Sequence, residues 1–301
     1  MTEAKSVLQR PHYVIVAPRY RDTSGGSVFL HTLADELVRI GERAVIWPMR
    51  WKKRRSCLPD LLRRMVQTFR DGMMPGTAAR LASSSDLSHD AIVVYPEVIA
   101  GNPLGARHVV RWLMYPPKLR GTATSFGPDD LYFKASDFSD DVALTGGAQL
   151  LHLFSVHPAY ADRGNRDRHG TCYMVRKQAG KPILHDPDRD ICLDGLDQAT
   201  IAGHFNRCAR FICYDEATMY AQFAALCGCL PIVVPGIYRT RAAWAADRPV
   251  ARYGVAFGVD DTEHAIATRG LLADHLRQME LEGRKTVRDF VARTKAEFGF
   301  A

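Results

Sequence analysis

Residues 12–47 carry the sequence HYVIVAPRYRDTSGGSVFLHTLADELVRIGERAVIW, and this stretch decides the fold. It opens with an apolar run rich in β-branched residues, and a glycine turn follows. Apolar residues then recur at helical spacing, and a second apolar run occupies residues 43–47. The order strand, helix, strand predicts a parallel βαβ unit, because two parallel strands need a crossover connection.

The same pattern extends along the chain. Residues 91–95 (AIVVY) and 108–113 (HVVRWL) predict two more buried strands of a first lobe. A turn-rich stretch follows, and beyond it we expect a second lobe with short strands at residues 131–135, 150–154, 172–175, 210–214 and 231–234.

We therefore expect an α/β protein of two Rossmann-like lobes facing a central cleft, which suits a chain of 301 residues. The predicted N-terminal domain spans residues 1–118 and the second domain spans residues 119–260. Residues 261–301 are charged, with apolar residues at helical spacing, and predict two C-terminal helices. Ligands of open parallel sheets bind beyond the carboxyl ends of the strands, so a site is expected there.

Composition narrows the class of protein. Hydrophobic residues make up 47% and charged residues 24%, as in globular proteins. The formal net charge of +7 favours anionic partners. Seven cysteines, an odd number and mostly within apolar runs, indicate reduced thiols and a cytoplasmic protein. No export signal and no run of about 20 apolar residues is found, so we expect neither export nor a membrane span.

One basic stretch is typical of a segment that binds a membrane surface. Residues 50–55 read RWKKRR and precede an apolar stripe at residues 58–69. Such a helix can lie on an anionic leaflet, which predicts peripheral association with the inner membrane through Arg50 to Phe69. The alternative is a helix that faces the core and carries a solvated basic side.

Two groups of residues suit phosphate binding. Gly25 and Gly26 join the first strand to its helix, where backbone N–H groups could face a phosphate or a sugar hydroxyl, or simply form a tight turn. Arg176, Lys177 and Lys181 follow a predicted strand and could neutralise a leaving diphosphate, or form an exposed basic turn.

The most informative segment is residues 210–235, RFICYDEATMYAQFAALCGCLPIVVP. It predicts a strand, an acidic turn, a helix, a turn of small residues and a second strand. Asp215 and Glu216 lie at the first strand's end, just before Thr218 opens the helix. Asp215 could instead be only the N-cap of that helix.

This segment resembles the donor-binding half of the GT-B glycosyltransferases. The resemblance implies that Glu216 holds the donor sugar and that Arg176 and Lys177 form the basic pair for the diphosphate. The family's second glutamate, which is expected to hold the donor ribose, falls on Ala224, and Gln222 is a substitute for it. Gly25 and Gly26 look like the family's N-terminal glycine loop.

Two further motifs are similar to bacterial surface-polysaccharide transferases of this architecture. They are YPEVIAGNPL at residues 95–104, followed by VVRW, and the pattern Tyr-Asp-x-x-Thr-x-Tyr from Tyr214 to Tyr220. The resemblance implies acceptor-side roles for Glu97, as a catalytic base, and for Asn102. His31, in the helix after the glycine turn, has a similar claim, although a lone helix histidine often only packs and a loop carboxylate is often only solvated.

The expected function is therefore transfer of a sugar from a nucleotide-sugar donor to a glycan or lipid-linked glycan acceptor, in capsule or lipopolysaccharide biosynthesis. Arg176, Lys177 and Lys181 would bind the donor together with Tyr214, Thr218, Tyr220 and Gln222, and Asp215 and Glu216 would hold its hydroxyls. No metal and no cofactor besides the donor substrate is expected.

Other classes of protein stay open. A basic nucleic-acid-binding protein would use Arg50 to Arg55 against a phosphate backbone, but no known nucleic-acid module is found, so no nucleic-acid partner is expected. A Rossmann-type oxidoreductase lacks the glycine fingerprint. A catalytically silent assembly partner is also compatible with Ala224.

Overall fold

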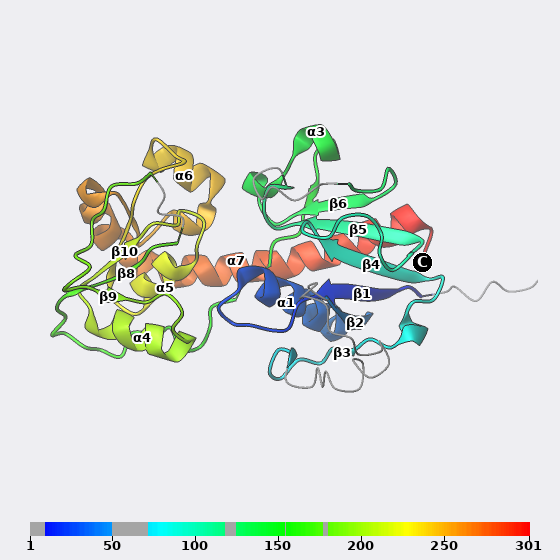
Figure 1. The fold of residues 1–301 in the computed structure, drawn as a ribbon, viewed down its shortest axis with the longest axis horizontal. Helices are drawn as coiled ribbons and strands as arrows, with labels where there is room; N and C mark the ends of the chain where they lie inside the picture. Colours follow the sequence, from blue (N-terminus) through cyan, green and yellow to red (C-terminus); the bar gives the residue numbers. More distant parts are fainter. Residues whose placement is uncertain (1–9, 50–71, 118–124, 154, 177–179) are drawn as a thin grey trace, which may run out of the picture. The chain divides into compact units, whose positions relative to one another are not determined.

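The computed structural model describes residues 10–49, 72–117, 125–153, 155–176 and 180–301. The chain forms two compact units. Unit 1 comprises Met1–Phe154 and Glu282–Ala301, and unit 2 comprises Ser155–Leu281. Each unit is built around a parallel sheet with helices beside it, as Figure 1 shows. The two Rossmann-like α/β lobes predicted from the sequence are therefore present.

Unit 1 contains a seven-stranded parallel sheet in the order β3-β2-β1-β4-β5-β6-β7. The strands are β1 (His12–Ala17), β2 (Arg43–Pro48), β3 (Arg80–Leu81), β4 (Ala91–Pro96), β5 (His108–Leu113), β6 (Leu131–Lys134) and β7 (Gln149–Leu150). Helix α1 (Gly25–Arg39) connects β1 to β2, and the short helix α3 (Val142–Thr145) precedes β7.

The central strands of unit 1 are buried along their whole length, since every residue of β1 and β4 is buried. This is the burial pattern of a parallel sheet covered on both faces. On one face, Leu30, Leu33 and Leu37 of α1 join the same core cluster as Tyr13 and Ile15 of β1. The predicted βαβ unit of residues 12–47 is thereby confirmed.

Unit 2 contains a five-stranded parallel sheet in the order β12-β11-β10-β8-β9. Its strands are β8 (Thr171–Met174), β9 (Ile191–Cys192), β10 (Arg210–Cys213), β11 (Leu230–Val233) and β12 (Ala256–Phe257). The helices that alternate with them are α4 (Gln198–Arg207), α5 (Tyr220–Leu226) and α6 (Arg241–Asp247). Short 3₁₀ turns occur at Ser84–Asp86, Asp137–Ser139, Pro249–Ala251 and Val259–Asp261.

The predicted domain boundary after residue 118 is wrong. Strand β6 pairs with β5, with Val110 opposite Leu131, and β7 pairs with β6. Residues 131–134 and 149–150 therefore extend the first sheet, and the first unit continues to Phe154. A buried apolar run marks a strand, but it does not identify the sheet that the strand joins.

The C-terminal region is one helix rather than the two that we predicted. Helix α7 runs from Thr262 to Phe298, over 37 residues. Its apolar residues serve two different cores, because Ala265 packs in a cluster of unit 2 whereas Phe290 packs in the core of unit 1. The apolar spacing is therefore interrupted where the helix passes from one core to the other, but the helix itself is continuous.

Each sheet has one point where the strand order reverses direction. In unit 1 the reversal lies between β1 and β4, and in unit 2 it lies between β8 and β10. The connections that follow two adjacent strands leave in opposite directions there, which opens a crevice at the carboxyl ends. None of the described helices has the length and apolar composition needed to cross a bilayer.

A close backbone contact of α7 gives a first prediction. A Cβ atom added at Gly283 would lie 2.7 Å from the carbonyl oxygen of His152, whereas one added at Gly270 would meet no atom within 4 Å. Gly283→Ala should lower the free energy of unfolding by about 1–3 kcal/mol, because the backbone cannot yield cheaply. Gly270→Ala should raise it by up to about 1 kcal/mol, since alanine favours the helix.

Urea denaturation of both variants tests this pair. Equal effects of the two substitutions would contradict the proposed close packing at Gly283.

Candidate functional site

A hollow of about 240 Å³ opens at the carboxyl edge of the unit 2 sheet. It lies at the reversal of strand order, because residues that follow β8 and β10 line it. Its lining consists of Gly180, Lys181, Tyr214, Asp215, Glu216, Gly236 and Ile237. Four predicted site residues, Lys181, Tyr214, Asp215 and Glu216, are therefore brought together at one place.

Lys181 is fully engaged by the protein. Its Nζ atom donates hydrogen bonds to the carbonyl oxygens of Tyr214 and Val234, both at 2.8 Å, and to Oε2 of Glu216 at 2.9 Å. An ammonium group has three protons, so none is left for a diphosphate in this arrangement. Lys181 instead joins the ends of β10 and β11, and its side chain is only 8% exposed.

Glu216 occupies a cradle of backbone donors. Its Oε1 accepts hydrogen bonds from the N–H groups of Gly236 at 3.0 Å and Tyr238 at 3.2 Å, and Oε2 accepts one from Ile237 at 2.9 Å. Three successive N–H groups that point at one anion form a nest. With Lys181 added, these bonds fill the roughly four acceptor positions of a carboxylate. The contacts favour a positioning role for Glu216 over direct contact with a sugar.

Burial alone would raise the pKa of the Glu216 carboxyl, but the hydrogen bonds from Ile237, Lys181, Tyr238 and Gly236 outweigh it and lower the pKa. Glu216 is therefore ionised. Gly236 is required for this geometry, because a Cβ atom there would overlap Cε of Lys181 and lie 2.9 Å from Nζ.

Tyr214 holds the segment that follows β8. Its hydroxyl accepts a hydrogen bond from the Leu184 N–H at 2.8 Å and lies 2.7 Å from Nδ1 of His185. The His185 ring stacks on Tyr173, with ring centroids 3.8 Å apart. Residues 180–186 thus form a strap anchored near both ends, by Lys181 and by His185.

The acidic turn after β10 is supported from α6. Oδ1 of Asp215 accepts a hydrogen bond from the Ala217 N–H at 2.9 Å. Helix α5 begins at Tyr220 with Met219 as its N-cap, so Asp215 is not the cap that we considered. The Trp244 indole donates to the carbonyl of Glu216 at 3.0 Å. Trp244 was not among the predicted site residues, because no motif marks it.

The remaining predicted donor residues lie around α5. The guanidinium of Arg176 sits over the Tyr220 ring, 5.3 Å from its centroid, and its Nε donates to Asp194 at 3.2 Å. Oγ1 of Thr218 accepts a hydrogen bond from the Tyr220 N–H at 3.3 Å. Gln222 is 1% exposed, and its Oε1 has no hydrogen-bond partner among the described residues. Lys177 lies outside the described residues, as do residues 50–71.

Unit 1 places other predicted residues at its own reversal of strand order. Gly25 and Gly26 follow β1, and Glu97 directly follows β4. Glu97 is 3% exposed, and its carboxylate accepts a hydrogen bond from the Met114 N–H at 3.3 Å. A Cβ atom at Gly26 would lie 3.7 Å from Cε of Met114, so Met114 links the glycine turn to Glu97.

His31 and Asn102 are tied to nearby backbone. Nδ1 of His31 accepts a hydrogen bond from the Met74 N–H at 3.3 Å, which leaves Nε2 to donate to the Pro18 carbonyl at 2.9 Å. Burial lowers the pKa of His31, so the ring is neutral. Oδ1 of Asn102 accepts hydrogen bonds from the Tyr95 hydroxyl and the Ala106 N–H, both at 3.0 Å.

Arg111 is a residue of this region that the sequence reasoning missed. It is fully buried, and it donates to Asp130 at 2.6 Å and to the carbonyl oxygens of Ile99, at 2.7 Å, and Gly101. It therefore holds the loop that carries Glu97 and Asn102. An arginine in the apolar run HVVRWL was the signal that could have found it, because a charged residue in a buried strand needs partners.

No group of three or more His, Cys, Asp or Glu side chains in the described parts of the chain is arranged to hold a metal ion. Six cysteines at described positions are free thiols, and all except Cys192 are buried. The ligand-binding roles predicted from the sequence for all these side chains stay predictions.

Comparisons with known proteins add similarities in fold. No protein-family model and no curated protein matches the chain. Among solved structures, sucrose-phosphate synthase from Thermosynechococcus elongatus is 10% identical, with 97% of this chain and 98% of that one covered and a TM-score of 0.39. The calicheamicin glycosyltransferase CalG4 is 12% identical, with coverage of 97% and 99% and a TM-score of 0.40. For T4 phage BGT in complex with UDP and Mn²⁺, the identity is 8%, the coverage 95% and 96%, and the TM-score 0.41.

The buried ion pair of Lys181 and Glu216 predicts that substitutions of the two residues have non-additive effects on stability. Lys181→Met should destabilise the protein by about 3–5 kcal/mol, because it leaves the Glu216 carboxylate buried without its ammonium partner. Glu216→Gln should also destabilise it. The free energy of unfolding lost in the double variant should be smaller than the sum of the losses in the two single variants. The difference should be at least about 1 kcal/mol, because the two side chains interact directly.

Urea denaturation of the four proteins measures this coupling. The exposed pair of Arg277 and Asp274, 2.5 Å apart, is the matched control and should show coupling near zero. Additive losses at Lys181 and Glu216 would contradict the pair.

The lowered pKa of Glu216 predicts a pH effect. Its contribution to stability is complete above the unfolded-state pKa, about 4.3, and is lost as the pH falls through the lower folded-state pKa. The wild-type protein should therefore lose stability more steeply than Glu216→Gln as the pH falls from about 5 to about 3. Denaturation curves across this range test it, and parallel pH profiles would show that Glu216 is not ionised in its cradle.

Proposed function

We propose that this protein is a nucleotide-sugar-dependent glycosyltransferase that binds its donor at the hollow of unit 2. The observation that carries the proposal is the position of this hollow at the reversal of strand order, where open α/β sheets bind their ligands. The lining combines a carboxylate, backbone polar groups and an apolar side chain, Ile237. Such a mixture suits a polyhydroxylated ligand that also carries an apolar base.

In this proposal the residues divide into two roles. Lys181 and Glu216 position the walls of the hollow, since their polar atoms are already used by the protein. Asp215 is the carboxylate for sugar hydroxyls. Arg176, whose side chain is 38% exposed, is the cation for the diphosphate. Lys177 would add a second cation.

We assign the acceptor to unit 1, with Glu97 as the catalytic base of an inverting transfer. The acceptor oxygen would form a bond to the anomeric carbon while the bond from that carbon to the diphosphate oxygen breaks. The hydroxyl proton would pass to Glu97, and the negative charge would leave with the nucleoside diphosphate next to Arg176.

The finer assignments rest on the resemblance of residues 95–104 and 214–220 to surface-polysaccharide transferases. We propose a glycan or lipid-linked glycan acceptor, a role in capsule or lipopolysaccharide biosynthesis, and action in the cytoplasm at the inner membrane.

The proposal is tested by thermal unfolding of the full chain with UDP, GDP, CMP and dTDP sugars. A ligand that binds only the folded protein raises the unfolding temperature, and at one hundred times its Kd it adds about 2.7 kcal/mol. One of the four nucleotide classes should do so. If none does, and the protein instead binds nucleic acid with a steep dependence on salt, the proposal fails in favour of a nucleic-acid-binding protein.

Substitution of Arg176 gives the corresponding residue-level prediction. Arg176→Ala should weaken donor binding about 10- to 100-fold, the loss expected for a charge-assisted hydrogen bond. Arg189→Ala, at a side chain that is 87% exposed, is the matched control, and Glu97→Gln in unit 1 should also leave donor affinity unchanged. Titration calorimetry with the donor found above measures all three. Undiminished affinity of Arg176→Ala would remove Arg176 from the site.

A further inference from the structure

The amino edge of the unit 2 sheet, opposite the hollow, carries a cluster of exposed cations that the proposed function does not use. Two segments contribute to it, residues 161–170 before β8 and residues 204–210 at the end of α4 and the start of β10. The exposed basic residues of these segments are Arg163, Arg166, His169, Arg207 and Arg210, and we call them the basic edge.

Backbone contacts hold the two segments of the basic edge side by side. The Arg163 N–H donates to Oδ1 of Asn206 at 2.8 Å. The His169 N–H donates to the Arg207 carbonyl at 3.2 Å, and the Arg210 N–H donates to the Gly170 carbonyl at 3.3 Å.

Because these three contacts join the two segments, their exposed cations lie on neighbouring parts of the surface.

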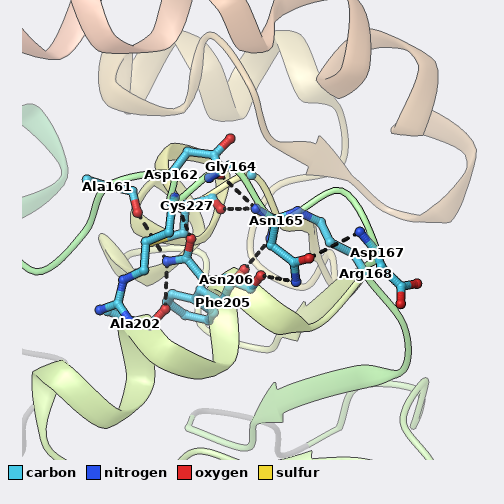
Figure 2. Close-up of polar contacts among 12 residues, drawn as sticks. Ala161, Asp162, Gly164, Asn165, Asp167, Arg168, Ala202, Phe205, Asn206 and Cys227 are labelled. Atoms are coloured by element: carbon cyan, nitrogen blue, oxygen red, sulfur yellow. Dashed lines mark hydrogen bonds and ion pairs between the residues drawn. The ribbon is translucent and has the colours of Figure 1, made fainter.

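A network of polar contacts ties these segments to the ends of α4 and α5, as Figure 2 shows. Arg168 donates to the carbonyl oxygens of Phe205 at 2.8 Å and Cys227 at 2.6 Å, which lie at the ends of α4 and α5. The Asn206 amide donates to the carbonyl oxygens of Ala161 and Ala202. The exposed arginines therefore project from a fixed frame.

The two segments carry a clear excess of positive charge. They contain five arginines against two aspartates, Asp162 and Asp167. Asp162 is paired with Arg168 at 2.9 Å, so it does not neutralise the exposed arginines. Tyr160 and Phe205, the aromatic residues next to and within the segments, are buried. The surface thus offers guanidinium groups without an exposed phenylalanine, tyrosine or tryptophan ring.

We propose that the basic edge binds the anionic phospholipid headgroups of a membrane surface. Guanidinium groups match phosphate geometry, and about four to eight clustered arginines or lysines suffice for electrostatic attachment to an anionic leaflet. The lack of an exposed phenylalanine, tyrosine or tryptophan ring on these described segments disfavours single-stranded nucleic acid, whose bases stack on such rings. Attachment at the amino edge leaves the hollow at the carboxyl edge open to a ligand.

Vesicle co-sedimentation of the full chain tests this surface. Vesicles of phosphatidylglycerol and phosphatidylcholine should bind the protein at low salt, and vesicles of phosphatidylcholine alone should not. Each arginine removed should weaken binding about fivefold. Arg163→Ala with Arg166→Ala should therefore weaken it about 25-fold, and Arg207→Ala with Arg210→Ala should do the same.

Arg189→Ala is the control for loss of one exposed arginine elsewhere in unit 2, and thermal unfolding confirms that each variant is folded. Binding that is unchanged in both double variants would overturn the proposal, including the case in which residues 50–55 alone carry the protein to the vesicles. Equal competition by duplex DNA and by anionic vesicles, lost together in the variants, would assign the surface to nucleic acid instead. Neither result depends on whether a nucleotide sugar binds the hollow.

Discussion

The contact between Lys181 and Glu216 is the constraint on which the candidate site of unit 2 depends. An ammonium and a carboxylate are withdrawn from water together at the ends of β10 and β11, where each finds partners for all its polar positions. A buried charge is tolerated only when it is paired and hydrogen-bonded, so neither side chain can be moved without exposing the other to a large desolvation cost. The residues that line the hollow are therefore held in place by this pair.

In unit 1, a different buried cation fixes a loop that follows a strand. Arg111 is buried in β5 and binds Asp130 together with two carbonyl oxygens of the loop after β4. Its guanidinium also lies between the rings of Tyr95 and Phe126, at 4.8 and 4.9 Å from their centroids. In both units, a buried cation fixes a loop that follows a strand next to the reversal of strand order. Such loops present polar groups to a ligand without having to order themselves when it binds.

The two edges of the unit 2 sheet carry different chemistry. The carboxyl edge holds a small hollow in which Lys181 and Glu216 are paired and buried, whereas the amino edge displays arginines on a surface tied together by Arg168 and Asn206. A parallel sheet separates the two naturally, because all its strands begin at one edge and end at the other. Our two proposals therefore use opposite edges of one sheet, the amino edge for an anionic surface and the carboxyl edge for a small ligand.

The sequence by itself determined the βαβ unit of residues 12–47, the α/β class and the position of Tyr214, Asp215 and Glu216 at a strand's end, because apolar periodicity and glycine turns are local properties. The tertiary structure decided what is non-local. Residues 131–134 joined the first sheet through pairing with β5, and α7 stayed continuous while its apolar residues served two cores. The tertiary structure also decided that Lys181 meets Glu216, 35 residues away, and so paired a predicted phosphate ligand with a buried carboxylate. A local sequence pattern cannot predict this contact, because the free energy of burying a charged group depends on the partners that the tertiary structure places beside it.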